Sequence, residues 1–243
     1  MPLSELDPLA WDDFRRWFRD AWEPGQHVAV IAPTGAGKTT LIGGLLDLRR
    51  YVLALDAKGG DSTLNALGYE RLSRWPGVRS MARRVDDNDD HGRPSRFIVG
   101  PVVHTERDRA ALRETCRQAL TDAFDMGGWT VVADELQVLT DPRLMGLREH
   151  ADNLLIAARA KAVSFVSAYQ SPRYVTPAAA QQASWVAVAY TRDKEVVGQL
   201  ADVLGRPRAE IRGAMDGLAD FAWMVVGRSP REPIRLTIPR KLI

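Results

Sequence analysis

Short apolar runs separated by longer amphipathic stretches make up most of this chain. Five runs are typical of buried parallel strands, at 27–31, 51–55, 129–133, 163–168 and 184–190, and a shorter run at 96–99 is a further candidate. Helical spacing of apolar residues predicts helices at 39–48, 105–126 and 194–204, and one more through Leu144, Leu147, Ala151, Leu154, Leu155 and Ala158. Because strands and helices alternate, the sequence predicts an α/β fold, with a mainly parallel sheet and helices on both faces.

Two stretches depart from this alternation. Residues 8–20 carry four aromatic residues at helical spacing with charges between them, which predicts an amphipathic helix through Trp11, Phe14, Trp17 and Phe18. Residues 57–95 are less regular. Within them, the Asp-rich and breaker-rich stretch 86–95 predicts an exposed polar loop.

The end of the chain has a different pattern again. Apolar runs at 221–226 and 234–238 predict a pair of strands around the polar segment 227–233. No low-complexity linker or internal repeat divides the chain. We therefore predict an N-terminal helix and lead-in over 1–26 and one domain with a β-rich tail over 27–243.

Composition excludes several classes of protein. The chain has 243 residues, of which 45% are hydrophobic and 26% charged, and it is long enough to bury its own core. It is therefore not mainly disordered, collagen-like or a disulfide-stapled miniprotein. Cys116 is the single cysteine, so no intrachain disulfide can form, which fits a reducing compartment. No apolar run approaches the ~20 residues of a membrane span, and residues 1–7 do not resemble a signal peptide. We therefore expect a cytoplasmic protein without membrane insertion.

Charge is nearly balanced overall but is carried mainly by arginine. The net charge is +2, with 28 Arg against 5 Lys. Residues 71–117 carry 11 Arg against 7 acids, and residues 205–243 carry 7 Arg and 1 Lys against 4 acids, so each stretch is +4. Arginine suits bidentate contacts with phosphate. A coding bias toward arginine and ordinary solvated surface charge explain the same counts.

The segment Ala32-Pro-Thr-Gly-Ala-Gly-Lys-Thr-Thr40 fits the phosphate-loop pattern G-x-x-x-x-G-K-[ST], except that Ala32 replaces the first glycine. An apolar strand precedes it and a helix follows, as the pattern requires. Gly35 and Gly37 let the backbone N–H groups turn toward phosphate oxygens. Lys38 would reach the β- and γ-phosphates, and Thr39 would place its hydroxyl on Mg²⁺. The residues predicted to bind ATP are Thr34, Gly35, Ala36, Gly37, Lys38, Thr39 and Thr40.

A second motif ends the apolar run 129–133 with two acids, Asp134 and Glu135. Adjacent carboxylates at a strand tip repel each other unless a metal ion offsets their charge. This is the Walker B pattern, in which Asp134 would hold Mg²⁺ together with Thr39, and Glu135 would act as the general base on the attacking water. A solvated Asp-Glu turn would give the same letters, but the preceding phosphate loop favours the metal site.

Several P-loop families can be set aside. The chain lacks an Asn-Lys-x-Asp guanine reader and a Leu-Ser-Gly-Gly-Gln signature, is too short for a two-core helicase, and ends in strands rather than in a helical lid. The remaining features of the sequence are similar to those of the HerA/FtsK superfamily of motors. Besides the two motifs, the resemblance rests on Asp56-Ala-Lys-Gly-Gly60, which is similar to that group's Asp-x-Lys-Gly. It also rests on the strand that ends in Tyr169-Gln-Ser-Pro172, where Gln170 and Pro172 match a Thr-Gln-Arg-Pro ending.

The resemblance implies further roles. Gln170 would be the polar sensor between the Walker B acids and the γ-phosphate. A ring of subunits needs an arginine that reaches the neighbour's phosphate, and Arg159 is the candidate, with Arg143, Arg148 and Arg173 as competitors. By the same comparison, Asp56 and Lys58 are structural or interface residues rather than catalytic ones.

The size of the chain is most similar to that of the minimal viral genome-packaging ATPases. The resemblance therefore implies an ATP- and Mg²⁺-dependent homo-oligomeric ring that moves double-stranded DNA, with a portal or other protein as partner, in the host cytoplasm if the protein is viral. Three alternatives stay open: a nucleotide switch that drives protein assembly, a conjugation- or segregation-type DNA pump, and, less favoured because of Glu135, a nucleotide kinase.

Overall fold

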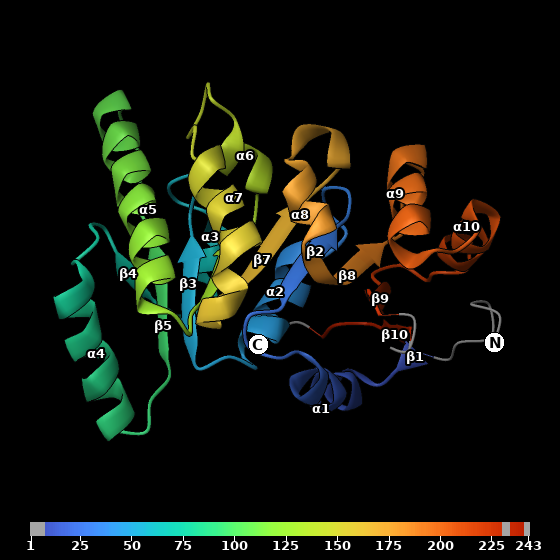
Figure 1. The fold of residues 1–243 in the computed structure, drawn as a ribbon, viewed down its shortest axis with the longest axis horizontal. Helices are drawn as coiled ribbons and strands as arrows, with labels where there is room; N and C mark the ends of the chain where they lie inside the picture. Colours follow the sequence, from blue (N-terminus) through green and yellow to red (C-terminus); the bar gives the residue numbers. More distant parts are fainter. Residues whose placement is uncertain (1–7, 230–233, 241–243) are drawn as a thin grey trace.

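All eight apolar runs that predict strands form them in a computed structural model, which describes residues 8–229 and 234–240 (Figure 1). The strands are β1 (Pro8–Leu9), β2 (His27–Ile31), β3 (Tyr51–Leu55), β4 (Glu70–Leu72), β5 (Ser95–Val99), β6 (Thr130–Ala133), β7 (Ser164–Tyr169), β8 (Ala183–Ala189), β9 (Trp223–Gly227) and β10 (Arg235–Thr237). They form one sheet in the order β1-β10-β9-β8-β2-β7-β6-β3-β5-β4. Within these described strands, β9 alone is antiparallel to its neighbours.

Helices cover both faces of the sheet, as the sequence predicts (Figure 1). They are α1 (Trp11–Ala21), α2 (Lys38–Leu46), α3 (Ser62–Asn65), α4 (Val78–Asp90), α5 (Glu106–Met126), α6 (Leu136–Thr140), α7 (Arg148–Ala157), α8 (Pro177–Gln181), α9 (Lys194–Leu204) and α10 (Arg208–Asp216), with 3-10 turns η2 (Ala158–Lys161) and η3 (Pro172–Tyr174). Side chains alternate along β2, so that Val28 and Val30 pack against α1 and α2, whereas Ala29 and Ile31 join the core beneath α5 to α10. The predicted α/β fold with its C-terminal strand pair is confirmed.

The predicted N-terminal helix forms, but it begins at Trp11 rather than at residue 8. Pro8 and Leu9 instead pair with β10 as a parallel edge strand, where a proline without an N–H is tolerated. The aromatic face of α1 is buried, and the ring of Phe18 meets Trp185 of β8 with centroids 5.3 Å apart. The helix is therefore fastened to the sheet through aromatic packing. Residues 1–7 of the predicted lead-in lie outside the described residues.

The prediction of an exposed loop over 86–95 is confirmed for residues 91–94 and wrong for 86–90, because α4 continues to Asp90. The apolar pattern does not indicate this helix, because Met81 is the residue of the helix that is buried. Polar contacts hold the helix instead: Asp89 accepts hydrogen bonds from Arg50 and from the Tyr51 hydroxyl, at 2.8 and 2.7 Å. Asn88 also donates to the Ser95 hydroxyl at 3.0 Å. A helix held by charged partners on neighbouring segments leaves no apolar period to detect.

A smaller difference concerns the helical face predicted from Leu144 onward. The helix α7 begins at Arg148, because Gly146 adopts a positive φ of 60° and closes a turn in which its N–H donates to Asp141 O at 2.8 Å. Leu144 therefore lies in this turn before the helix, whereas Ala151, Leu154 and Leu155 are buried as predicted.

The parallel strands bring four motif-bearing segments to one edge. Strand β7 lies between β2 and β6, and β3 lies beside β6, so the residues that follow these strands meet at their carboxyl ends. The phosphate loop follows β2, the two acids follow β6, Gln170 follows β7, and Asp56 to Gly60 follow β3. This edge, at the top of Figure 1, is where parallel α/β folds bind ligands. None of the helices in the described ranges combines the length and apolar character that crossing a bilayer requires.

Candidate nucleotide-binding site

The phosphate loop has the backbone that its glycines make possible. Gly35 and Gly37 have φ of 83° and 85°. A side chain in this left-handed region costs roughly 1–2 kcal/mol. Gly37 is the N-cap of α2, and no side chain caps this helix end. The first N–H groups of α2 are therefore available to an anion, which the helix dipole also favours. The loop is tied to β7, where the Ala32 N–H donates to Tyr169 O at 3.2 Å.

The side chain of Lys38 folds back over the phosphate loop. Its Nζ donates to the carbonyl oxygens of Ala32 and Pro33, at 2.9 and 3.0 Å. Burial lowers the pKa of this ammonium group, and the charges of Asp134 and Glu135 oppose that shift. The ammonium group therefore sits in the loop and can exchange its two carbonyl partners for phosphate oxygens.

The two residues predicted to hold a metal ion lie together. Thr39 Oγ1 donates to Asp134 Oδ2 at 3.3 Å, while Asp134 Oδ1 is buried without a hydrogen-bond partner among the described residues. Burial, with the nearby charge of Asp61, raises the pKa of Asp134. A hydroxyl and an unsatisfied carboxylate oxygen are ligands that fit Mg²⁺. No group of three or more His, Cys, Asp or Glu within the described ranges could hold a metal alone, so phosphate oxygens and water would complete the shell.

Lys58 is the site residue that sequence reasoning missed. The resemblance implies a structural or interface role for Lys58, yet its Nζ lies 3.3 Å from Glu135 Oε1 and 3.3 Å from Asp61 Oδ2. All three line a cavity of about 310 Å³ together with the phosphate loop and Asp134. The site therefore holds two lysines against three carboxylates. The usable signal was the position of Lys58 just beyond a strand tip, but the order of the strands was needed to place it beside Glu135.

Asp56 fixes the loop that presents Lys58. Its carboxylate is almost completely buried and accepts the N–H groups of Gly59, Gly60 and Asp61 at 2.9, 2.8 and 3.1 Å. Arg71 neutralises it from 2.8 Å. This agrees with a structural role for Asp56, because a buried carboxylate so bonded holds the backbone of the loop in one conformation.

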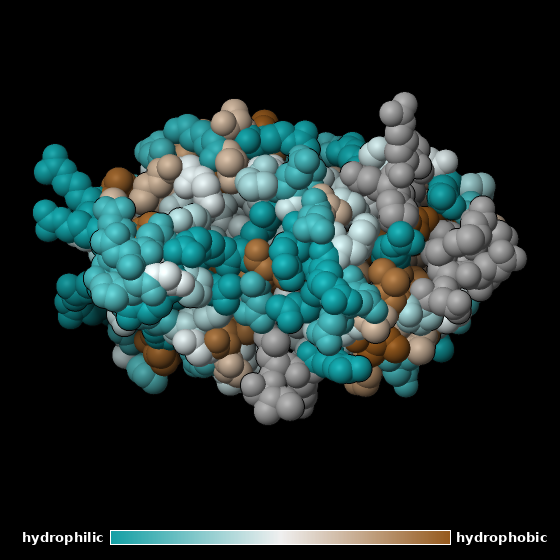
Figure 2. Space-filling model, turned by 90° about the horizontal axis from the view of Figure 1, so that it is seen from below, coloured by the Kyte–Doolittle hydropathy of each residue, from teal (hydrophilic) through white to brown (hydrophobic). Residues whose placement is uncertain are grey.

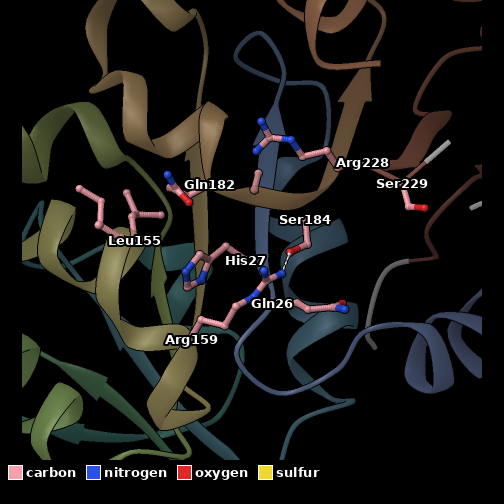
Figure 3. Close-up of a pocket in the computed structure, with 10 residues that line it drawn as sticks. Gln26, His27, Leu155, Arg159, Gln182, Ser184, Arg228 and Ser229 are labelled. Atoms are coloured by element: carbon pink, nitrogen blue, oxygen red, sulfur yellow. Dashed lines mark hydrogen bonds between the residues drawn. The ribbon is translucent and has the colours of Figure 1, made fainter. Parts of the chain in front are cut away.

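Gln170 and Arg159 occupy different ends of the sheet. Gln170 is exposed at the carboxyl end of β7, between the strands that lead to the phosphate loop and to Asp134. Arg159 lies in η2, just before the amino end of β7, and donates to the Ser184 hydroxyl at 3.0 Å (Figure 3). The structure thus brings Gln170 to the edge that carries the phosphate loop and leaves Arg159 at the opposite edge of the same subunit.

A pocket of about 510 Å³ surrounds Arg159. Figure 3 shows Gln182 and Arg228 across the pocket from Arg159, with the imidazole of His27 beside Arg159. Burial, and to a smaller extent the charge of Arg159, lowers the pKa of His27 to about 4, so this imidazole is neutral near pH 7. Its Nδ1 accepts the N–H of Phe165 at 3.0 Å, which makes it a structural bridge between β2 and β7. The face that carries the amino ends of the strands is mainly hydrophilic (Figure 2).

The competing arginines lie closer to the carboxyl ends of the strands. Arg143 is exposed in the turn after α6, where its N–H donates to Asp141 at 2.8 Å. Arg173 is in η3, directly after β7, and forms an ion pair with Glu195. Arg148 begins α7.

The fold and the phosphate loop define the class: this is the RecA-like fold of the P-loop ATPases. No protein-family model and no curated protein sequence matches the chain. Solved structures do. The DNA-packaging ATPase B204 from Sulfolobus turreted icosahedral virus superposes with a TM-score of 0.59 at 15% identity, over 90% of this chain and 100% of that one.

Two further structures support the same fold. The genome-packaging NTPase B204 of Sulfolobus turreted icosahedral virus 2, in complex with AMPPCP, has a TM-score of 0.56 at 14% identity, over 90% of this chain and all of that one. The cytoplasmic domain of the type VII secretion ATPase EccC of Thermomonospora curvata has a TM-score of 0.50 at 16% identity, over 90% of this chain and 26% of that one. The expected resemblance to the viral packaging ATPases of the HerA/FtsK superfamily is therefore confirmed at the level of the fold.

Proposed function

We propose that the protein is a Mg²⁺-dependent ATPase whose subunits assemble into a ring and move double-stranded DNA, as in genome packaging. One observation carries the proposal: Lys38, the Thr39–Asp134 pair and Glu135 line a single cavity at the phosphate loop. The fold around that cavity is shared along the full length of a viral DNA-packaging ATPase. Such a ring would act beside a portal or another protein, in the host cytoplasm if the protein is viral.

The proposed chemistry uses residues that follow four strands of the sheet, β2, β3, β6 and β7. The N–H groups of the loop and Lys38 bind the phosphates, and Thr39 and Asp134 would hold Mg²⁺, which offsets phosphate charge when bound. Glu135 accepts a proton from the water whose oxygen bonds to the γ-phosphorus, while the bond to the bridging oxygen breaks and releases ADP. Lys58 keeps the carboxylate of Glu135 paired before the nucleotide arrives. Gln170, at the tip between the two motifs, would orient the γ-phosphate or the water.

Duplex DNA is expected to stimulate the ATPase activity of the assembled ring. Phosphate contacts position a protein without reading sequence, so DNA of any sequence should stimulate equally. Stimulation should weaken as salt rises, because binding releases condensed counterions. The measurement is the ATPase rate of ring-assembled protein with and without duplexes of unrelated sequence, at several salt concentrations. A rate that ignores DNA at low salt but responds to a protein partner would favour the nucleotide switch.

The two basic stretches contribute less free charge than their counts suggest. Six of the 11 arginines in 71–117 form ion pairs with acids: Arg71, Arg84, Arg93, Arg96, Arg109 and Arg117. In 205–243, Arg206 pairs with Glu210, while Arg231 and Lys241 lie outside the described residues. The DNA proposal therefore rests on the site and the fold rather than on these stretches.

An arginine that acts across the subunit interface would make activity depend on assembly. Such a finger contributes roughly 10³ to 10⁵ in rate in P-loop enzymes, so specific activity should rise steeply with protein concentration. An Arg159→Ala protein should lose that contribution. Mixing it with Glu135→Gln protein should restore part of the rate, because each variant supplies what the other lacks.

Arg143→Ala and Arg173→Ala are the comparison variants in the same mixing assay. Rescue with one of these and none with Arg159→Ala would transfer the role to the carboxyl edge. Specific activity that is independent of concentration, with no rescue in any mixture, would contradict action across the interface.

A further inference from the structure

A second cavity, of about 270 Å³, adjoins the phosphate cavity. Both are lined by Gly37 and Thr40, so they are neighbours at the first turn of α2. The remaining lining residues come from the end of the chain: Phe221, Trp223, Ile238 and Pro239. A group attached to the phosphate that is bound nearest Thr40 would therefore enter a slot with mainly apolar walls.

Phe221 lines this slot in an unfavourable backbone conformation and with its side chain exposed. Its side chain is 61% exposed, and its backbone has a positive φ of 61°, which is unfavourable for a bulky residue. The ring lies beside the phosphate loop: its Cδ1 is 3.6 Å from the position that a Cβ on Gly37 would occupy. An exposed aromatic side chain on a strained backbone, next to a phosphate site, marks a surface that a ligand covers.

The inner wall and the rim of the slot support the same interpretation. Trp223 is fully buried, and its Nε1 has no hydrogen-bond partner among the described residues. Ile238, in contrast, is 41% exposed at the rim. The slot thus combines an aromatic face with an apolar rim, which suits a flat heteroaromatic ring better than a sugar or a peptide.

We propose that this slot binds the base of the nucleotide, with the ring of Phe221 stacked on it while residues 34–39 hold the phosphates. The inference rests on the proposed ATPase function and adds the determinant of base binding. Stacking tolerates every base that has a π-face. Among the described lining residues, the side chains of Thr40 and Trp223 alone carry polar groups. ATP and GTP therefore bind with similar affinity.

The test separates the base from the phosphates by comparing ATP with inorganic tripolyphosphate in calorimetry. Phe221→Ala is expected to weaken ATP binding by about 10-fold, the loss typical of one stacked base, and to leave tripolyphosphate binding unchanged. Phe221→Trp should retain the affinity for ATP. The matched control is Ile156→Ala, which removes another exposed apolar side chain, 63% exposed, from α7.

The outcomes distinguish the two proposals. Unchanged ATP affinity in Phe221→Ala, in a protein whose wild type binds and hydrolyses ATP, overturns the base slot alone. An equal loss of ATP and tripolyphosphate binding also overturns it, because the change then acts on the phosphate loop. A wild type that binds neither ligand overturns the proposed function and this inference together.

Discussion

Replacing Lys38 by alanine is expected to weaken ATP binding by at least about 100-fold. The ammonium group already makes two hydrogen bonds in the loop, to the carbonyl oxygens of Ala32 and Pro33, and in the complex it would make them to phosphate. Hydrogen bonds to charged groups are worth about 1.5–3 kcal/mol each, and every 1.4 kcal/mol is a factor of ten. Calorimetric titration with ATP and Mg²⁺ measures the loss.

Lys194→Ala is the control for this prediction. Lys194 is an exposed lysine at the start of α9, away from the phosphate loop. Thermal unfolding should be nearly unchanged in both variants, because neither ammonium group is fully buried. Unaltered nucleotide binding and unaltered turnover in Lys38→Ala would remove the basis for placing phosphate at this loop.

The second large effect separates the two acids. Glu135→Gln keeps the shape of the side chain but removes the proposed base, so ATP should stay bound while hydrolysis slows by roughly 10² to 10⁴, the usual contribution of a general base. Asp134→Asn removes the charge from a carboxylate whose Oδ2 accepts from the Thr39 hydroxyl and whose Oδ1 has no hydrogen-bond partner among the described residues. Its expected defect is a higher Mg²⁺ concentration for half-maximal rate.

Single-turnover hydrolysis with prebound ATP measures the first effect, and Mg²⁺ titration of the steady-state rate measures the second. The two variants are controls for each other, since they neutralise adjacent carboxylates of similar burial. Wild-type turnover by Glu135→Gln would assign the base elsewhere. An unaltered Mg²⁺ requirement in Asp134→Asn would remove this carboxylate from the metal site.

The core of the fold could be predicted because buried elements leave a recognisable pattern of apolar residues in the sequence. Strands such as β2 and β6 are covered on both faces, so they appear as unbroken apolar runs. Elements held by polar contacts could not be found in this way. The helix α4 buries Met81 and is otherwise fixed by partners such as Arg50, which lies far away in sequence. The two-residue strand β1 exists only because β10 lies beside it.

The residues of the candidate site also fall into two groups, those that the sequence identifies and those that only the fold brings together. The phosphate loop and the Asp134–Glu135 pair are contiguous in sequence, so local chemistry identifies them. The ion pair between Lys58 and Glu135 depends on β3 lying next to β6, and the place of Phe221 beside Gly37 depends on the C-terminal strands returning toward β2. Neither neighbourhood follows from spacing, because both are set by the order of the strands in the sheet.

That order also dictates when the site can form during synthesis. Strand β2 is made early, but its neighbours β7 and β8 are made much later, and the contact between Phe165 and His27 spans 138 residues. The pairing of β1 with β10 forms last, since the hydrogen bond from Thr237 to Leu9 spans 228 residues. Contacts so distant in sequence slow folding, because a long loop must close before they form. A nascent chain that stops short of Tyr169 thus carries the whole phosphate-loop sequence but lacks the carbonyl that ties Ala32 in place.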